Sequence, residues 1–230
     1  MSDSPRIDFY APVHKAYRAF MCDTLVRLGC IDLDDAAQAA SVMSQVRALL
    51  ASMRAHLAHE NNFMHPLITS TGQAPASAAE HGEHEREIAE LALLTTHAAS
   101  AAREERDGLA HTLYHRLSLL VADHFEHMLG EEVDNNRVLW AHYTDAQLIE
   151  THDALVASIE PATFMEIMGW MLPALTPREL AQVMQGARCS APPEVFEALL
   201  SLAASTLAPE RWNKLRAALS VESAVACAVA

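Results

Sequence analysis

Histidine is unusually frequent in this 230-residue chain, which contains 13, ten of them between His56 and His127. His56 precedes Glu60 by four positions, and His127 precedes Glu131 by the same spacing. Residues four apart in an α-helix lie on one face, one turn from each other. Each pair can therefore hold one cation, because imidazole and carboxylate groups are ligands of first-row transition metals.

Three more histidines are candidate ligands because they occupy the predicted buried faces of other helices: His14, His81 and His84. Neighbouring antiparallel helices bring two residues to the same height when the mean of their position numbers falls at the connecting turn. Three pairs satisfy this condition at the three predicted turns: His14 with His56, Glu60 with His84, and His84 with His127. The sequence thus predicts one site in which four imidazoles and two carboxylates hold a pair of first-row transition metal ions.

His81 and two further histidines need a separate assignment. His81 shares the predicted face of His84, and it is either a fifth histidine ligand or a hydrogen-bonding residue outside the ligand set. His124 lies one turn before His127, and it is either a ligand or an outer support for one. His65 falls off the predicted buried face of its helix, so we expect it to be exposed to solvent.

Apolar residues at alternating steps of three and four predict the long helices that must carry these ligands. The predicted ranges are about 8–29, 34–69, 81–102 and 109–140. The segments that connect them are Asp32–Asp35, Ser70–Pro75 and the charged run Arg103–Gly108. Long helices joined by short connections predict an all-α fold, specifically an up-down-up-down four-helix bundle.

The chain is predicted to contain two domains. Residues 1–140 form the bundle with its di-metal site, and residues 141–230 form a C-terminal extension of short helices packed on the bundle. Proline and capping signals mark the starts of these short helices, as at Pro161, at Thr176-Pro177 and at Pro209. We find no tandem repeat with a period of 20–50 residues.

The amino-acid composition excludes several classes of fold and of partner. The chain has 16 Lys and Arg against 30 Asp and Glu, a formal net charge of −14, which argues against a nucleic-acid partner. Only 7 Gly and 10 Pro accompany abundant alanine, which excludes an all-β fold. No window is apolar enough to span a membrane and no signal peptide is evident, so we expect a cytoplasmic protein without membrane contact. The oligomeric state is left open.

At these positions the chain resembles the hemerythrin-like (HHE, cation-binding) family. The resemblance rests on His14, on His56-Leu-Ala-His59-Glu60, on His84-Glu85, and on His127 with Glu131-Glu132, and it covers about residues 8–140. The order His-x-x-x-Glu also differs from the Glu-x-x-His of ferritin-like sites. The oxygen carriers of the resembled family have His-x-x-x-His on the third helix, where this sequence has His81-x-x-His84.

The resemblance implies a non-haem centre of two iron ions that reacts with oxygen, nitric oxide or peroxide. Two functions are consistent with it: binding of O2 or NO, or sensing of iron or redox state, and alternatively a peroxidase-type or oxygenase-type enzyme acting on peroxide or a small substrate. Turnover with peroxide would separate the enzyme from the binding protein. Zinc or manganese could replace iron in the same ligand set, and zinc would leave the site a structural role.

Overall fold

The computed structural model describes residues 6–222, and it contains no β-strand within that range, as the sequence predicts. The outermost residues of both predicted domains, 1–5 and 223–230, lie outside the described residues. The first part of the chain comprises α1 (Ala11–Gly29), α2 (Ala36–His59), η1 (Glu60–Met64), α3 (His65–Ser70), α4 (His81–Ser100), α5 (Arg103–Gly130), η2 (Glu131–Asn135) and α6 (Asn136–His142). Over the described range, none of the helices has both the length and the apolar character needed to cross a bilayer.

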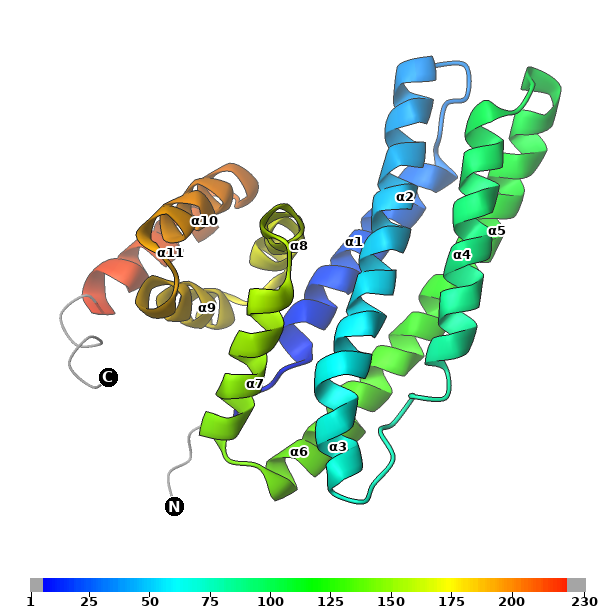
Figure 1. The fold of residues 1–230 in the computed structure, drawn as a ribbon. Helices are drawn as coiled ribbons and strands as arrows, with labels where there is room; N and C mark the ends of the chain where they lie inside the picture. Colours follow the sequence, from blue (N-terminus) through cyan, green and yellow to red (C-terminus); the bar gives the residue numbers. More distant parts are fainter. Residues whose placement is uncertain (1–5, 223–230) are drawn as a thin grey trace. The chain divides into compact units, whose positions relative to one another are not determined.

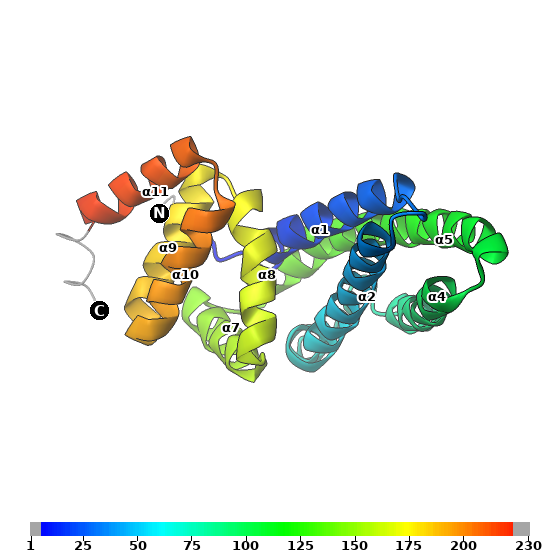
Figure 2. The ribbon, with the colours of Figure 1, turned by 90° about the horizontal axis from the view of Figure 1, so that it is seen from above.

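The long helices of this part pack through the faces that the apolar spacing predicts. α2 packs against α4, and α4 packs against α5 (Figures 1 and 2). α1 is tied to α2 by Arg27, which donates hydrogen bonds to Gln45 and Ser41. Gly29 lies against the ring of Tyr114 on α5, where a Cβ atom would come within 3.0 Å of the ring.

Local signals explain where the helices begin. The Asp35 carboxylate caps α2 by accepting hydrogen bonds from the N–H groups of Ala37 and Gln38. The sequence predicts a helix start at residue 109, but α5 begins at Arg103, so the charged segment is the first part of the helix. Glu104 and Glu105 stand in its first turn, where acidic side chains stabilise the positive end of the helix dipole.

Two five-residue π-helices interrupt the long helices, and each begins at a carboxylate of the candidate site. η1 begins at Glu60 and η2 begins at Glu131. The N–H of His65 donates to the carbonyl oxygen of Glu60, five residues earlier, and the N–H of Asn136 donates to that of Glu131. A π-turn holds one more residue than an α-turn, so every residue after it is displaced by one position around the helix.

This displacement changes which residues are buried within η1 and after it. The sequence predicts Phe63 and Leu67 on the buried face, but both are only half-buried. Met64, His65 and Ile68 are buried in their place. The prediction is wrong here because the three-and-four spacing assumes an uninterrupted α-helix.

The chain divides into two compact units: residues 1–11 with 18–157, and residues 12–17 with 158–230. The predicted domain boundary at residue 140 falls before α7 (Asp145–Ser158), most of which belongs to the first unit. The second unit contains α8 (Pro161–Ala174), α9 (Pro177–Ser190), α10 (Pro193–Thr206) and α11 (Pro209–Glu222). In this unit α8 packs against α10, and α9 packs against α11.

α7 to α11 form a regular series. Each of these helices has 14 residues, and each begins 16 residues after the one before, at 145, 161, 177, 193 and 209. Corresponding positions in successive helices hold apolar residues, as in Leu180, Phe196 and Trp212. This period of 16 residues consists of one 14-residue helix and a two-residue link. It is shorter than the periods of 20–50 residues for which the sequence shows no tandem repeat.

Candidate metal centre

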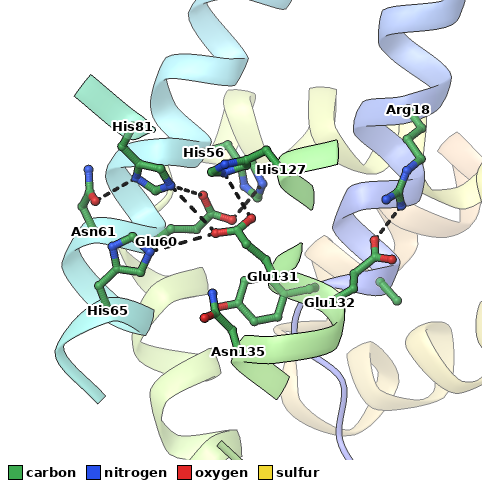
Figure 3. Close-up of polar contacts among 12 residues, drawn as sticks. Arg18, His56, Glu60, Asn61, His65, His81, His127, Glu131, Glu132 and Asn135 are labelled. Atoms are coloured by element: carbon green, nitrogen blue, oxygen red, sulfur yellow. Dashed lines mark hydrogen bonds and ion pairs between the residues drawn. The ribbon is translucent and has the colours of Figure 1, made fainter. Parts of the chain in front are cut away.

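Four side chains meet inside the first unit, in the part of the fold where the sequence places a metal site. The donor atoms of Glu60, His81, His127 and Glu131 all lie within 4.8 Å of one another. Each side chain is buried, and no more than 3% of any of these residues is exposed. They come from the first residue of η1, the first residue of α4, the last turn of α5 and the first residue of η2 (Figure 3). We call these four residues the central quartet.

The imidazoles of the central quartet point their Nε2 atoms at its carboxylates. His81 Nε2 lies 3.7 Å from Glu60 Oε2 and 3.8 Å from Glu131 Oε1. His127 Nε2 lies 3.4 Å from Glu131 Oε2. These separations leave room for an ion whose bonds to nitrogen and oxygen are each about 2.0–2.2 Å.

The hydrogen bonds of the Nδ1 atoms of His81 and His127 determine which ring nitrogen can bind a metal. His81 Nδ1 lies 2.9 Å from the side-chain oxygen of Asn61, and His127 Nδ1 lies 2.9 Å from Glu80 Oε2. Both oxygens only accept hydrogen bonds, so each Nδ1 carries the ring proton and each Nε2 carries a lone pair. This outer support is typical of metal-binding histidines.

The lone pairs therefore face carboxylate oxygens in a buried space. Neither His81 Nε2 nor His127 Nε2 has a hydrogen-bond partner among the described residues. A buried acceptor that faces another acceptor is unfavourable unless a cation lies between them. The residues of the central quartet thus fit a bound metal ion, and their mixture of imidazole and carboxylate suits a first-row transition metal.

His65 is a residue that the sequence assigns to the surface and that the structure brings to the site. Only 8% of it is exposed, and its Nε2 lies 4.0 Å from Glu131 Oε1. Its ring centroid is 4.7 Å from that of His81. Burial, and secondly the nearby His81, lowers the pKa of His65 to about 4, so its ring is neutral at pH 7. A search for a residue five positions after Glu60, instead of three or four, would have found it.

His84 is buried as predicted, but it does not belong to the central quartet. It groups with Glu80 and His127, and its ring stacks on that of His124 with centroids 4.1 Å apart. Burial, followed by the neighbouring His127, lowers the pKa of His84. Burial and the adjacent His84 lower the pKa of His124 to about 3.

The remaining predicted ligands are His14, which lies in the second unit, and His56, which lies in the first unit with Glu60. His14 is fully buried on α1, whereas the side chain of His56 is 12% exposed. His56 Nε2 lies 3.1 Å from Glu60 Oε1, at the i, i+4 spacing of the sequence motif. Five of the seven candidate residues therefore lie together in the first unit: the four of the central quartet, and His56 beside Glu60.

Tyr10 closes the side of the site next to η2. It is 2% exposed, and its hydroxyl accepts a hydrogen bond of 3.3 Å from Asn135 Nδ2. Burial, and secondly the nearby carboxylates of Glu131 and Glu60, raises the pKa of the Tyr10 phenol well above its usual range. The phenol is therefore neutral and stays a hydrogen-bond donor at every physiological pH.

Comparisons with known proteins identified no relative of this chain. A scan against protein-family models and searches of curated proteins and of solved structures found no match to this chain.

Proposed function

We propose that this protein is a metal-binding protein with a hemerythrin-like four-helix bundle, in which the central quartet holds a first-row transition metal ion. The bundle consists of α1, of α2 continued by η1 and α3, of α4, and of α5 continued by η2 and α6. The observation that carries the proposal is the pair of buried Nε2 atoms, on His81 and His127, that face the carboxylates of Glu60 and Glu131 at 3.4–3.8 Å.

The two oxygens of Glu60 support a second ion beside the first. Oε2 lies 3.7 Å from His81 Nε2, whereas Oε1 lies 3.1 Å from His56 Nε2. Since each oxygen of Glu60 faces a different imidazole, Glu60 with His56 would hold a second ion beside the one at the central quartet. Two non-haem iron ions are the proposed occupants, with zinc and manganese as the other ions that this donor set accepts.

Iron bound there would supply a position for O2, NO or peroxide and the capacity for electron exchange. The chain's own residues orient the imidazole rings and exclude water. Asn61 and Glu80 hold the rings of His81 and His127 in the orientation that binds metal. Apolar side chains at full burial, among them Met53, Ile88 and Leu120, keep water from the ligands. This arrangement supports binding or sensing of a small diatomic ligand.

Metal analysis of the purified chain tests the proposal. We expect about two iron ions per chain, with an absorption band in the near ultraviolet and visible that changes on reduction and on exposure to air. His81→Ala is expected to lose the metal and the band. His97→Ala, which removes an exposed histidine from the same helix, is expected to keep both.

Three results would contradict parts of this proposal. A protein with unchanged metal content in His81→Ala would show that the central quartet is not the binding site. Zinc alone with a featureless spectrum would remove oxygen and nitric oxide as ligands. Rapid turnover of peroxide would show that the protein is an enzyme and not a binding protein.

A further inference from the structure

A pocket of about 480 Å³ lies between α9, α10 and α11 of the second unit. Its wall includes Phe196, Leu200 and Ala204 of α10, Trp212 and Arg216 of α11, and Arg188 of α9. We call it the arginine pocket. We propose that it binds a small organic anion, namely a carboxylate joined to an apolar chain or ring. Every lining residue belongs to the second unit, so the inference does not depend on the metal centre.

The arginine pocket follows one face of the repeated helices. The fourth, eighth and twelfth residues of each 14-residue helix are four positions apart, so they lie on one side of it. In α8 and α9 the eighth residues, Met168 and Met184, are at most 4% exposed and belong to the hydrophobic core. In α10 and α11 Phe196, Leu200 and Trp212 hold positions of the same face, but they are only partly buried. The apolar face that closes the core in the earlier helices is therefore open at the pocket.

The charge at the pocket departs from the pattern of the series. The eighth position is Met in α8 and α9 and Leu in α10, but it is Arg216 in α11. The twelfth residue of α9 is Arg188, which donates a hydrogen bond of 2.9 Å from Nη1 to the carbonyl oxygen of Leu219 in the pocket wall. No Asp or Glu occurs at positions 184–192 or 212–220, and none is among the described residues that line the pocket. Two guanidinium groups thus share a pocket lined by no carboxylate among those residues, although the whole chain has a net charge of −14.

These side chains favour a ligand that has both a charge and an apolar surface. A guanidinium group binds a carboxylate through two parallel hydrogen bonds, and it is more weakly hydrated than an ammonium group. The rings of Phe196 and Trp212 offer apolar area that a chain or ring of the ligand would bury. A volume of about 480 Å³ falls within the range of small-molecule sites, about 300–1,000 Å³. Acetate would use only the arginines, and an alcohol would use only the apolar wall.

Calorimetric titration of the full chain with octanoate tests the inference. A chelator is present throughout, so that a carboxylate cannot bind a metal ion at the central quartet. We expect one octanoate per chain. Acetate has the charge without the apolar chain, octan-1-ol has the apolar chain without the charge, and each should bind at least tenfold more weakly. Octanoate that binds no more tightly than octan-1-ol, or that binds in many copies without saturation, would overturn the inference.

Substitutions on α11 then locate the binding. Arg216→Ala should weaken octanoate binding at least tenfold, and Arg216→Lys should recover part of the loss because it keeps the charge. Lys214→Ala is the matched control, since Lys214 is another exposed cation of α11 that is not among the residues lining the pocket. Both positions are exposed, so the helical circular dichroism of the variants should equal that of the wild type.

Equal octanoate affinities in Arg216→Ala and Lys214→Ala would overturn the inference. So would a dimer in sedimentation analysis that dissociates in Arg216→Ala, because a second copy of the chain would then cover the pocket.

Discussion

The two helices that carry the carboxylates use the same backbone device for different purposes. In both, a His-x-x-x-Glu motif is followed by a five-residue π-helix that begins at the glutamate. Five positions after Glu60 stands His65, whose Nε2 lies 4.0 Å from Glu131 Oε1 in the candidate metal centre. Five positions after Glu131 stands Asn136, whose amide donates to Asp8 at 2.9 Å.

This difference divides the site into two halves. The residues around η1 include a further possible metal ligand, whereas the residues around η2 form hydrogen bonds that hold the fold. After η1 the displaced register adds a side chain that can bind metal. At the end of η2 there are two buried amides, Asn135 as the last residue of η2 and Asn136 as the next residue. They bind the loop before α4 and the segment before α1. A π-turn thus places an additional side chain near a candidate ligand, and the residue type decides whether that side chain could bind metal or forms structural hydrogen bonds.

The largest effect is expected at the glutamates, where the two halves should behave alike. Glu60→Gln and Glu131→Gln should each weaken metal binding at the centre by more than about 100-fold, since each removes a charged ligand. The metal-free variants should remain folded, because a neutral amide is less costly to bury than a carboxylate. Equilibrium dialysis with Fe²⁺ or Zn²⁺ measures the affinity.

Glu132→Gln is the matched control for Glu131→Gln. Glu132 is the next residue, and it forms an ion pair of 2.6 Å with Arg18 outside the central quartet. The control should keep the wild-type affinity. Equal losses in Glu132→Gln and Glu131→Gln would mean that charge near α5, and not ligation, determines binding.

The halves should then differ at the last residue of η2 and at the residue that follows η1. Asn135→Ala should lower the free energy of unfolding by about 1–3 kcal/mol, because the N–H of Ala76 loses its acceptor at 2.8 Å. His65→Ala should leave the stability of the metal-free protein nearly unchanged and should weaken metal binding. Urea unfolding and metal titration of both variants measure the two effects. A loss of stability in His65→Ala as large as that in Asn135→Ala would make the two halves equivalent.

A smaller effect is expected from the residue that orients His81. Asn61→Ala removes the acceptor for His81 Nδ1, and we expect metal affinity to fall by at least about tenfold. Because Asn61 is exposed, the fold should not change. Asn62→Ala, at the next exposed position of η1, is the control and should bind metal normally. The same affinity in both variants would show that the hydrogen bond does not position the ring.

The smallest effect concerns pH and the metal-free protein. The pKa of His124 is lowered to about 3 from its usual 6.5, so below pH 6.5 the unfolded chain binds a proton that the folded chain does not. Stability should therefore fall as the pH drops below 6.5, by at most about 1.4 kcal/mol per pH unit from this group. His124→Gln should reduce this slope between pH 7 and 5, measured by urea unfolding with chelator present. His97→Gln should not, and an unchanged slope in His124→Gln would show that another group is responsible.

Much of the site was predictable because helix geometry is local. The i, i+4 spacing of His56 with Glu60 and of His127 with Glu131 is sufficient to place each pair on one face. The apolar spacing likewise predicted the buried positions of α4 and of α5 correctly, from Ile88 and Leu91 to Leu117. These inferences need only the backbone of one helix, and they require no knowledge of its neighbours.

The choice between His81 and His84 was not predictable in the same way. The position averages placed His84 opposite Glu60, but the averages assume straight helices and turns of equal height. In the structure His81, at the first residue of α4, faces Glu60 and Glu131, whereas His84 stacks on His124. That assignment depends on how α4 is rotated against α2 and α5, which is a property of their packing.

The sequence by itself determined the helical class, the shared helix face of each His-x-x-x-Glu pair and most buried positions, because these follow from composition and from the α-helical period. Only the tertiary structure decided the π-turns at Glu60 and Glu131, the burial of His65 and the stacking of His84 on His124. A π-turn leaves no mark in a three-and-four pattern, since its extra residue is stabilised by contacts with other helices. The helical periodicity can be predicted from the sequence, whereas an interruption of that periodicity is determined by packing between helices.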